Sequence, residues 1–585
     1  MAIDHLARGL SASQRRTFAS TEAGKGAALV GTTSGLTLQT VLDYNLGVSV
    51  SGVAVGGDAA DAIEAAHQRA KVLGVDVLLP PYMVRLSRPI RVNRLRGTPG
   101  ASKINVSDMT MGVYPLSQFC IVNEHWTTTY NPNSADLCLF SGFEILTTPN
   151  KRQSLIGLAN VRFADIDQLT LRASRNLDPD GKPYGVDALL DFYAAVHGAS
   201  VRRSTFRQET GAYGANQVSA GGGGCIWIRN FSGNGTLADN ITEKIVVQDC
   251  DFYHYTTDEC IAIFGVRGVT RNCRVNGNQI YGLEASDLGI NASESIYRPS
   301  LLSIFPLNDG SGATLGATAA VHGNEFSDNR IYEKSALYSV IRVGSTTDSS
   351  QRCENNAIRN NYVEFYFSTD RNTGPLAVWT NAGSNGVNPA SASIAIRCIE
   401  GTPGISYSGI LSGNVSQGNE VIVRAGATIT AAFSGWQSLK GCSTRGSITT
   451  AAMTCKHVEG GRYETALRGF VNCGFICNAT IRINLGGTVN AACVVDDPSG
   501  GTYAITGCQI NTSGPLVYVS AIVTGDVALS ATVNTGFINA QPALNILAAN
   551  AVVRANGNYI LGASGVAAGV GTVKNAYNTW GLTDD

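Results

Sequence analysis

The fold of this chain is decided by residues 56–92, GGDAADAIEAAHQRAKVLGVDVLLPPYMVRLSRPIRV. Apolar residues recur at helical spacing after the two glycines, which predicts a short amphipathic helix. They are Ile63, Ala66, Ala70 and Leu73. We expect Asp58 to be the N-cap, because its carboxylate can accept a hydrogen bond from the free amides of the first turn. Gly74 is expected to end the helix.

A strand, a double proline and a second strand follow this helix. Val75, Val77 and Leu79 alternate with other residues as a buried strand does, Pro80-Pro81 interrupts the strand, and Ile90–Val92 begins another. This order resembles the opening of phage tailspike and pectate-lyase-superfamily domains. There the helix covers the first coil of a right-handed parallel β-helix, whose bare end would expose its core and its strand edges.

Composition narrows the function classes. The 585 residues carry a net charge of −1 and are only 15% charged, so no basic surface indicates a nucleic-acid partner. The first residues have no apolar stretch of the signal-peptide type, and no run of about 18 apolar residues occurs, so we expect cytoplasmic synthesis and no membrane insertion. The 14 cysteines form no CxxC pairs and are expected to be reduced core residues.

The sequence pattern divides the chain into three segments. Residues 1–50 resemble the neck of tailspikes, which implies a particle-attachment segment that binds a phage tail or baseplate protein. Residues 51–475 are expected to form the β-helix, which binds substrate and carries the catalytic residues: short strands there alternate with Asn, Asp or Gly corners at intervals of about 20–30 residues, as in solenoid coils. Residues 476–585 are expected to form a β-rich trimerisation segment. Residues 186–196 could be either a helix or a buried strand.

Asparagine is suited to the corners of such coils. It tolerates left-handed backbone geometry, and its side-chain amide can hydrogen-bond the backbone or a stacked neighbour. Examples are Asn324 and Asn329 in VHGNEFSDNRI and Asn361 in CENNAIRNNY.

The segment Asp258-Glu259-Cys260-Ile261-Ala262-Ile263 is the strongest candidate for chemistry. We expect a strand with Ile261 and Ile263 in the core, preceded by Glu259, which would face outward next to Asp258 at the turn. Repulsion between the two acids would raise one pKa and make that group a proton donor. The segment is similar to the Asp-Asp-Cys-Val/Ile-Ala-Ile/Val motif of polygalacturonase-type hydrolases, although Glu replaces the second Asp and that family's later motifs are not recognisable.

Other residues in the central coils are candidates for the site. Glu284 and Asp287 compete as catalytic carboxylates, since neighbouring coils lie about 4.8 Å apart and bring distant residues together. The expected substrate-binding residues include a histidine that could also act as a base, aromatic rings for sugar faces, further carboxylates, and arginines for acidic sugars. They are His254, Tyr253, Tyr255, Tyr281, Glu294, Arg298, Glu325 and Arg342. No metal site and no cofactor are predicted.

The resemblance implies a homotrimeric tailspike of a phage virion, assembled in the host cytoplasm and acting at the bacterial cell surface. Its partner would be a capsular polysaccharide or the O-antigen of lipopolysaccharide. Two adjacent carboxylates favour endo-glycosidic hydrolysis. A lyase that cleaves a uronate-containing glycan by β-elimination is the alternative, and a glycan-binding adhesin without enzymatic activity is a further one.

Overall fold

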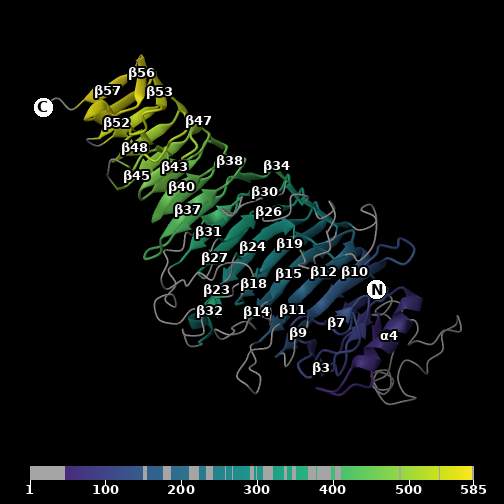
Figure 1. The fold of residues 1–585 in the computed structure, drawn as a ribbon. Coiled ribbons are helices and arrows are strands. Elements are labelled where there is room, and N and C mark those ends of the chain that lie inside the picture. The colour runs from purple at the N-terminus through teal and green to yellow at the C-terminus, as the bar shows by residue number, and fades with distance from the viewer. Residues whose placement is uncertain are drawn as a thin grey trace, which may run out of the picture.

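The computed structural model of the chain is a long solenoid with a helix at its N-terminal end (Figure 1). It describes residues 47–148, 154–174, 186–209, 223–231, 241–256, 258–266, 268–289, 296–297, 300–306, 320–334, 339–344, 351–366, 377–378, 397–401, 410–485, 489–538, 541–576 and 578–582. Each turn of the chain adds one strand to each of three parallel ladders. The predicted parallel β-helix is therefore confirmed.

The first ladder forms one face of the solenoid. Each strand in it hydrogen-bonds the equivalent strand of the next coil. In order, it contains β4 (Ile90–Arg91), β7 (Phe119–Val122), β10 (Ser154–Asp167), β12 (Ala188–Val196), β15 (Gly224–Asn230), β19 (Ile261–Gly265), β24 (Leu302–Pro306), β28 (Ile341–Val343), β33 (Arg397–Glu400), β37 (Ile429–Ser434), β40 (Ile448–Met453), β43 (Arg468–Val471), β46 (Cys493–Val495), β49 (Val517–Val519), β52 (Pro542–Ile546) and β55 (Gly565–Gly569).

The second ladder begins with the first described strand of the chain, and β10 is long enough to belong to both ladders. It contains β1 (Val48–Ser49), β2 (Val77–Leu78), β5 (Arg94–Arg96), β8 (Asp136–Ser141), the end of β10, β13 (Ala199–Arg202), β17 (Ile245–Gln248), β21 (Arg274–Asn276), β26 (Glu325–Ser327), β30 (Ala357–Arg359), β35 (Val415–Gln417), β38 (Ser438–Lys440), β41 (His457–Glu459), β44 (Phe475–Cys477), β47 (Gly501–Thr506), β50 (Val527–Thr532), β53 (Ala551–Asn556) and β56 (Thr572–Ala576).

The third ladder completes each coil. It contains β3 (Met83–Arg85), β6 (Lys103–Asn105), β9 (Glu144–Thr147), β11 (Thr170–Ala173), β14 (Thr205–Gln208), β18 (Asp251–His254), β22 (Gln279–Gly282), β27 (Arg330–Glu333), β31 (Tyr362–Phe365), β36 (Glu420–Val423), β39 (Ser443–Gly446), β42 (Arg462–Thr465), β45 (Thr480–Ile483), β48 (Gln509–Thr512), β51 (Thr535–Ile538), β54 (Tyr559–Ala563) and β57 (Thr579–Leu582).

Two small sheets supplement the central coils. One contains β16 (Ile241–Glu243), β20 (Val269–Arg271), β25 (Ala320–His322), β29 (Arg352–Glu354) and β34 (Ile410–Ser412), and the other pairs β23 (Ile296–Tyr297) with β32 (Ala377–Val378). The strands of the first small sheet lie in sequence between the first and second ladders of each coil.

The predicted capping helix is α4 (Ala60–Leu73), and Gly74 ends it in a left-handed conformation with a φ of 67°. Its apolar stripe is buried against the first coils, with Ile63 in the main core. The prediction for Asp58 was wrong by one residue, because Ala59 is the N-cap. Asp58 Oδ1 accepts the amide of Ala60 at 3.2 Å, and its carboxylate also binds the amide and hydroxyl of Ser87. The acid therefore joins the helix start to the following turn.

Stacked asparagines hold the corners together, as the sequence predicted. Asn278 donates from Nδ2 to Asn329 Oδ1 at 2.9 Å, Asn329 donates to Asn361 at 2.9 Å, and Asn361 donates to Asn419 at 3.0 Å. Each of these side chains also donates to a backbone carbonyl. A left-handed residue precedes each one; for Asn361 it is Asn360, with a φ of 52°.

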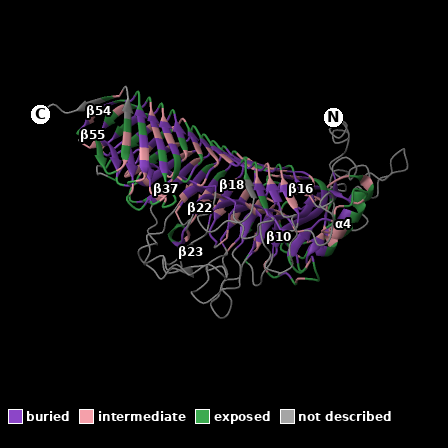
Figure 2. Ribbon diagram, turned by 45° about the horizontal axis from the view of Figure 1, so that its top comes forward, coloured by how far each residue is buried: buried purple, intermediate pink, exposed green. Residues whose placement is uncertain are grey.

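The interior is apolar and contains thiols. The rings of Phe206 and Phe252 stack in it with centroids 4.9 Å apart, and all 14 cysteines are free and buried, as predicted. Residues 188–196 form a buried strand rather than a helix. In the coils near β54 and β55, buried and exposed residues alternate along the strands (Figure 2).

The described ladders continue past residue 475 to β57 with the same parallel pairing. The last hundred residues are therefore further coils of the solenoid, while their role in trimerisation stays a prediction. Most of the predicted neck, residues 1–46, lies outside the described residues. None of the described helices is long and apolar enough to span a membrane.

Candidate active site

Asp258 and Glu259 lie where the chain passes from the third ladder to the first, between β18 and β19. Ile261 and Ile263 point into the core, as the alternation predicted. Glu259 is turned away from that core, but it is 8% exposed rather than open to solvent. Asp258 is half-buried, so the chain brings two neighbouring acids together at a partly desolvated corner.

The two acids contact each other. The Asp258 carboxyl is hydrogen-bonded to that of Glu259, and Asp258 Oδ1 also accepts the Glu259 amide at 2.9 Å. Burial raises the pKa of Asp258 well above its usual value, and the hydrogen bond and charge of Glu259 raise it further. The negative charge of Asp187 acts in the same direction. Asp258 therefore holds a proton under conditions that ionise an ordinary aspartate.

Two serines of the next coil position Glu259. Ser300 Oγ and Ser303 Oγ lie 3.4 and 3.3 Å from Glu259 Oε1, and the two hydroxyls are 2.5 Å apart. Ser303 is in register with Ala262 on the outer face of β24. The hydrogen bonds therefore tie Glu259 to the outer side of the first ladder.

Aromatic rings and arginines lie on the same outer face. Phe264 and Phe305 stack with centroids 5.6 Å apart, and Trp227 meets Phe264 edge-on at 6.0 Å. Arg229 lies over Trp227 and forms a bidentate pair with the buried Asp191, with Nε–Oδ1 at 3.0 Å and Nη2–Oδ2 at 2.5 Å. This face therefore combines largely buried aromatic rings with a fixed ion pair.

Glu284 and Asp287 are engaged elsewhere. They form a reciprocal capping box around the 3-10 helix η2 (Ala285–Leu288). Lys334 Nζ lies 2.6 Å from Asp287 Oδ1 and 3.6 Å from Glu284 Oε1. Because local contacts and a cation already satisfy these acids, we do not assign them the catalytic step.

His254 and Tyr255 are fully buried. His254 Nε2 lies 3.2 Å from the Gly223 carbonyl and 3.0 Å from Thr256 Oγ1. Tyr255 packs with Leu283, Ala285 and Leu288. A glycan on the solenoid surface would reach either side chain only if this corner opened.

Tyr253 and Tyr281 lie on the outer face of the third ladder in a column with Tyr332. Neighbouring rings are 5.0 Å apart and nearly parallel. Arg207 covers the free end of the column over Tyr253. The ring faces are occupied by one another, so this column presents edges and hydroxyls instead of the open faces on which sugars stack.

The remaining candidates are dispersed. Glu325 pairs with Arg359 at 3.3 Å on the second ladder, while Arg342 lies on β28 of the first ladder. Glu294 and Arg298 lie outside the described residues.

The sequence reasoning missed Asp187, Asp191 and Arg229. A usable signal was a charged residue inside an apolar strand: Asp191 interrupts Leu189-Leu190 and Phe192-Tyr193, and Arg229 follows Ile226-Trp227-Ile228. A charge at such a position needs a partner. The structure places the partners on adjacent strands, β12 and β15.

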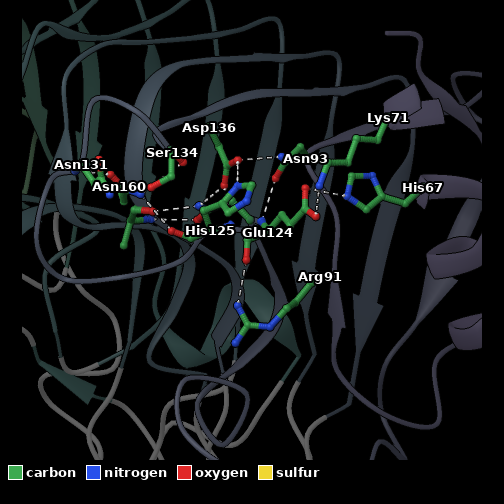
Figure 3. Close-up of polar contacts among 12 residues, drawn as sticks. His67, Lys71, Arg91, Asn93, Glu124, His125, Asn131, Ser134, Asp136 and Asn160 are labelled. Carbon is green, nitrogen blue, oxygen red and sulfur yellow. Dashed lines mark hydrogen bonds and ion pairs between the residues drawn. The ribbon is translucent and has the colours of Figure 1, made fainter. Parts of the chain in front are cut away.

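One group of residues has the composition of a metal site. Ligand atoms of Glu124, His125 and Asp136 lie within 4.8 Å of one another. Asp136, however, accepts hydrogen bonds from Asn93, from Asn123 and from the His125 amide, and His125 Nδ1 lies 2.8 Å from its Oδ1 (Figure 3).

Lysine and histidine from the capping helix complete this group. Lys71 Nζ lies 2.6 Å from Glu124 Oε1, and His67 Nε2 lies 3.5 Å from Glu124 Oε2 (Figure 3). Lys71 pairs with one oxygen of Glu124, whereas Glu124 Oε2 and His67 Nε2 are buried without a hydrogen bond. The contacts join α4 to the residue 123–136 segment.

No family model and no curated protein matches the chain. The similar solved structures include the tailspike of E. coli bacteriophage HK620: a variant complexed with a hexasaccharide is 13% identical, with a TM-score of 0.47 over 90% of this chain and 84% of that chain. The Streptococcus pneumoniae surface adhesin PfbA is 11% identical, with a TM-score of 0.38 over 82% and 99%. A GH87 alpha-1,3-glucanase from Streptomyces thermodiastaticus is 12% identical, with a TM-score of 0.30 over 92% and 70%. These values assign no residue or activity to this chain, and tailspikes are among the solved structures to which it is similar.

Proposed function

We propose that this protein is a phage tailspike that binds a bacterial capsular polysaccharide or O-antigen and cleaves it by endo-glycosidic hydrolysis. The observation that carries the proposal is the contact between Asp258 and Glu259, in which burial and the neighbouring acid raise the pKa of the Asp258 carboxyl. Glycosidases need a protonated acid for the leaving oxygen and a second carboxylate as nucleophile or base. The resemblance of residues 56–92 to tailspike openings supplies the biological setting.

Asp258 is the proposed acid, since its raised pKa keeps it protonated. Glu259 is the proposed second carboxylate, fixed by Ser300 and Ser303. Retaining glycosidases place their two carboxyls about 5–5.5 Å apart, and inverting glycosidases place them about 6.5–9.5 Å apart. Asp258 and Glu259, in contrast, are in direct contact. A bound glycan must therefore replace their contact, or Asp187 must supply the second carboxylate while Asp258 and Glu259 share the acid proton.

The deciding experiment incubates the purified protein with capsule and O-antigen from a panel of bacteria and measures chain length by size-exclusion chromatography. Shortened chains with new reducing ends support hydrolysis. Shortened chains carrying an ultraviolet-absorbing unsaturated uronate would assign β-elimination instead. Binding without shortening would assign the adhesin role, and absence of binding to every glycan would refute the proposal.

The proposal includes assembly as a homotrimer and attachment to the phage tail or baseplate through the N-terminal residues. The protein would be assembled in the host cytoplasm and act at the bacterial cell surface as part of the virion. Phage particles carrying the protein should adsorb only to bacteria that display the glycan. Adsorption to mutants that lack the glycan would contradict this role.

A further inference from the structure

Two arginines on the outer face of the first ladder differ in how their charge is balanced. Arg229 lies between the rings of Tyr193 and Trp227, at 4.6 and 4.7 Å, and both sides of its guanidinium fork bind Asp191. This is the expected solution for a guanidinium in an apolar setting, because an unpaired charge there is costly.

Arg342, on β28, has no such partner. Its guanidinium lies 5.8 Å from the ring centroid of Phe305, and Nε is buried without a hydrogen bond. Within the described ranges it makes no ion pair with an acid. The acid in register with Arg342 on the neighbouring strand, Glu400 on β33, is paired with Arg397 at 3.0 Å. Among the described residues, this half-buried cation next to an aromatic ring therefore has no acid paired with it.

Arg342 is also one strand away from the catalytic candidates. It is in register with Ser303, whose Oγ lies 3.3 Å from Glu259 Oε1. Adjacent strands are about 4.8 Å apart. A group bound by Arg342 would therefore belong to a sugar ring at or next to the bond that Asp258 and Glu259 are proposed to cleave.

We propose that the glycan contains an acidic sugar and that Arg342 binds its carboxylate at this position. This inference takes the position of the cleavage site from the proposed function and adds the class of substrate. A carboxylate suits the planar guanidinium fork, which offers two parallel N–H donors. It would also form the ion pair that Arg342 makes with none of the described acids, and a neutral glycan offers no such partner. Both hydrolysis and β-elimination are compatible with such a contact.

The test combines a change in the protein with a change in the glycan. Arg342→Gln removes the charge, and Arg342→Lys keeps a charge without the fork. Arg359→Gln is the matched control, since Arg359 belongs to the same coil but faces outward on β30 and pairs with Glu325. The probes are acidic capsular polysaccharides and the same polymers after chemical reduction of their carboxylates to alcohols, with dextran as a neutral reference. Calorimetry measures binding, so the result does not depend on cleavage.

We expect carboxyl reduction to weaken binding by wild type and by Arg359→Gln on the order of 10- to 100-fold. Arg342→Gln should lose a similar factor on the native polymer and nothing further on the reduced one, and Arg342→Lys should fall between. An unchanged sensitivity to carboxyl reduction in Arg342→Gln would overturn the inference, as would binding restricted to neutral glycans. If binding of a sulfated or phosphorylated polymer depends on Arg342 in the same way, Arg342 binds an anion other than a carboxylate. That result would overturn only the carboxylate assignment. Cleavage of neutral chains would leave the proposed function standing, and tight binding of acidic chains without cleavage would refute only the enzymatic proposal.

Discussion

The carboxyl group of Asp258 is hydrogen-bonded to that of its sequence neighbour Glu259 at the corner between the third and first ladders of the solenoid. Burial and the neighbouring Glu259 raise the pKa of the Asp258 carboxyl. The contact between the two acids should therefore affect both the turnover of the protein and the pH dependence of its stability.

Removal of either carboxyl should abolish most of the turnover. We expect Asp258→Asn and Glu259→Gln to lower kcat roughly 10²- to 10⁴-fold on a cleavable glycan, because an amide can neither donate the acid proton nor act as a base. Glu325→Gln is the matched control on the second ladder. Asp187→Asn distinguishes the two arrangements: a comparable loss would make Asp187 the second carboxylate, and a rate near that of wild type would leave the role to Glu259. Wild-type turnover in both pair variants would refute the assignment.

The contact between Asp258 and Glu259 should lower the free energy of unfolding at neutral pH. The pKa of Asp258 is raised in the folded protein, so above its ordinary value of 3.8 the folded state binds more protons than the unfolded state. The free energy of unfolding therefore falls as pH rises through this window. Asp258→Asn should raise Tm at pH 7 by roughly 1–3 °C and leave it unchanged below pH 4. Thermal melts of both proteins between pH 3 and 8 test this, and parallel curves would contradict it.

The asparagine column should be a major source of stability. Asn329→Ala removes the acceptor for Asn278 and the donor to Asn361 and Val275. Leaving such buried groups unsatisfied should lower the free energy of unfolding by about 3 kcal/mol. Asn484→Ala, at an exposed position, should change it by less than about 0.5 kcal/mol. Denaturant unfolding that finds equal losses in both variants would contradict the structural role.

The C-terminal coils should contain the contacts between copies of the chain. Residues 498–582 contain only three charged residues, Asp526, Arg554 and Lys574. Phe537 and Leu561 are neighbours on the third ladder and remain 48% and 40% exposed. We expect Phe537→Asp combined with Leu561→Asp to convert trimers to monomers in sedimentation velocity, since burying charge in an interface is costly. Val72→Asp, on the exposed side of α4, is the control; a wild type that is monomeric would refute the trimer itself.

The architecture could be predicted because each of its signals is local. The helix from Ala60 to Leu73, its end at Gly74 and the Asn corners depend on residues only a few positions apart. The exact N-cap was missed because Asp58 also binds Ser87, a contact across almost thirty residues. Residues 188–196 were ambiguous because an entirely buried strand lacks the polar alternation that separates strand from helix.

Only those contacts of the candidate site that lie within a single coil could be predicted from the sequence. The adjacency of Asp258 and Glu259 is written in the sequence, and so is their position before a buried strand. Which residues of other coils meet them depends on register, and the connections between coils vary in length. Ser303, Asp187 and the pairing of Arg229 with Asp191 are contacts of this kind. The stacking that buries the faces of Tyr253 and Tyr281 likewise needs three coils to become visible.

The corner between the third and first ladders is the place where the coils differ most. The connections there cover residues 209–223, 255–260, 283–301 and 366–396, whereas the neighbouring corners that precede the third ladder are residues 249–250, 277–278, 328–329 and 360–361. The three ladders and the asparagine columns lie outside this corner, and the only described pairing within it is that of β23 with β32. A segment can therefore be lengthened or exchanged there without changing the register of the ladders. Insertions at this corner can therefore change the outer surface of the solenoid while the register of its strands stays the same.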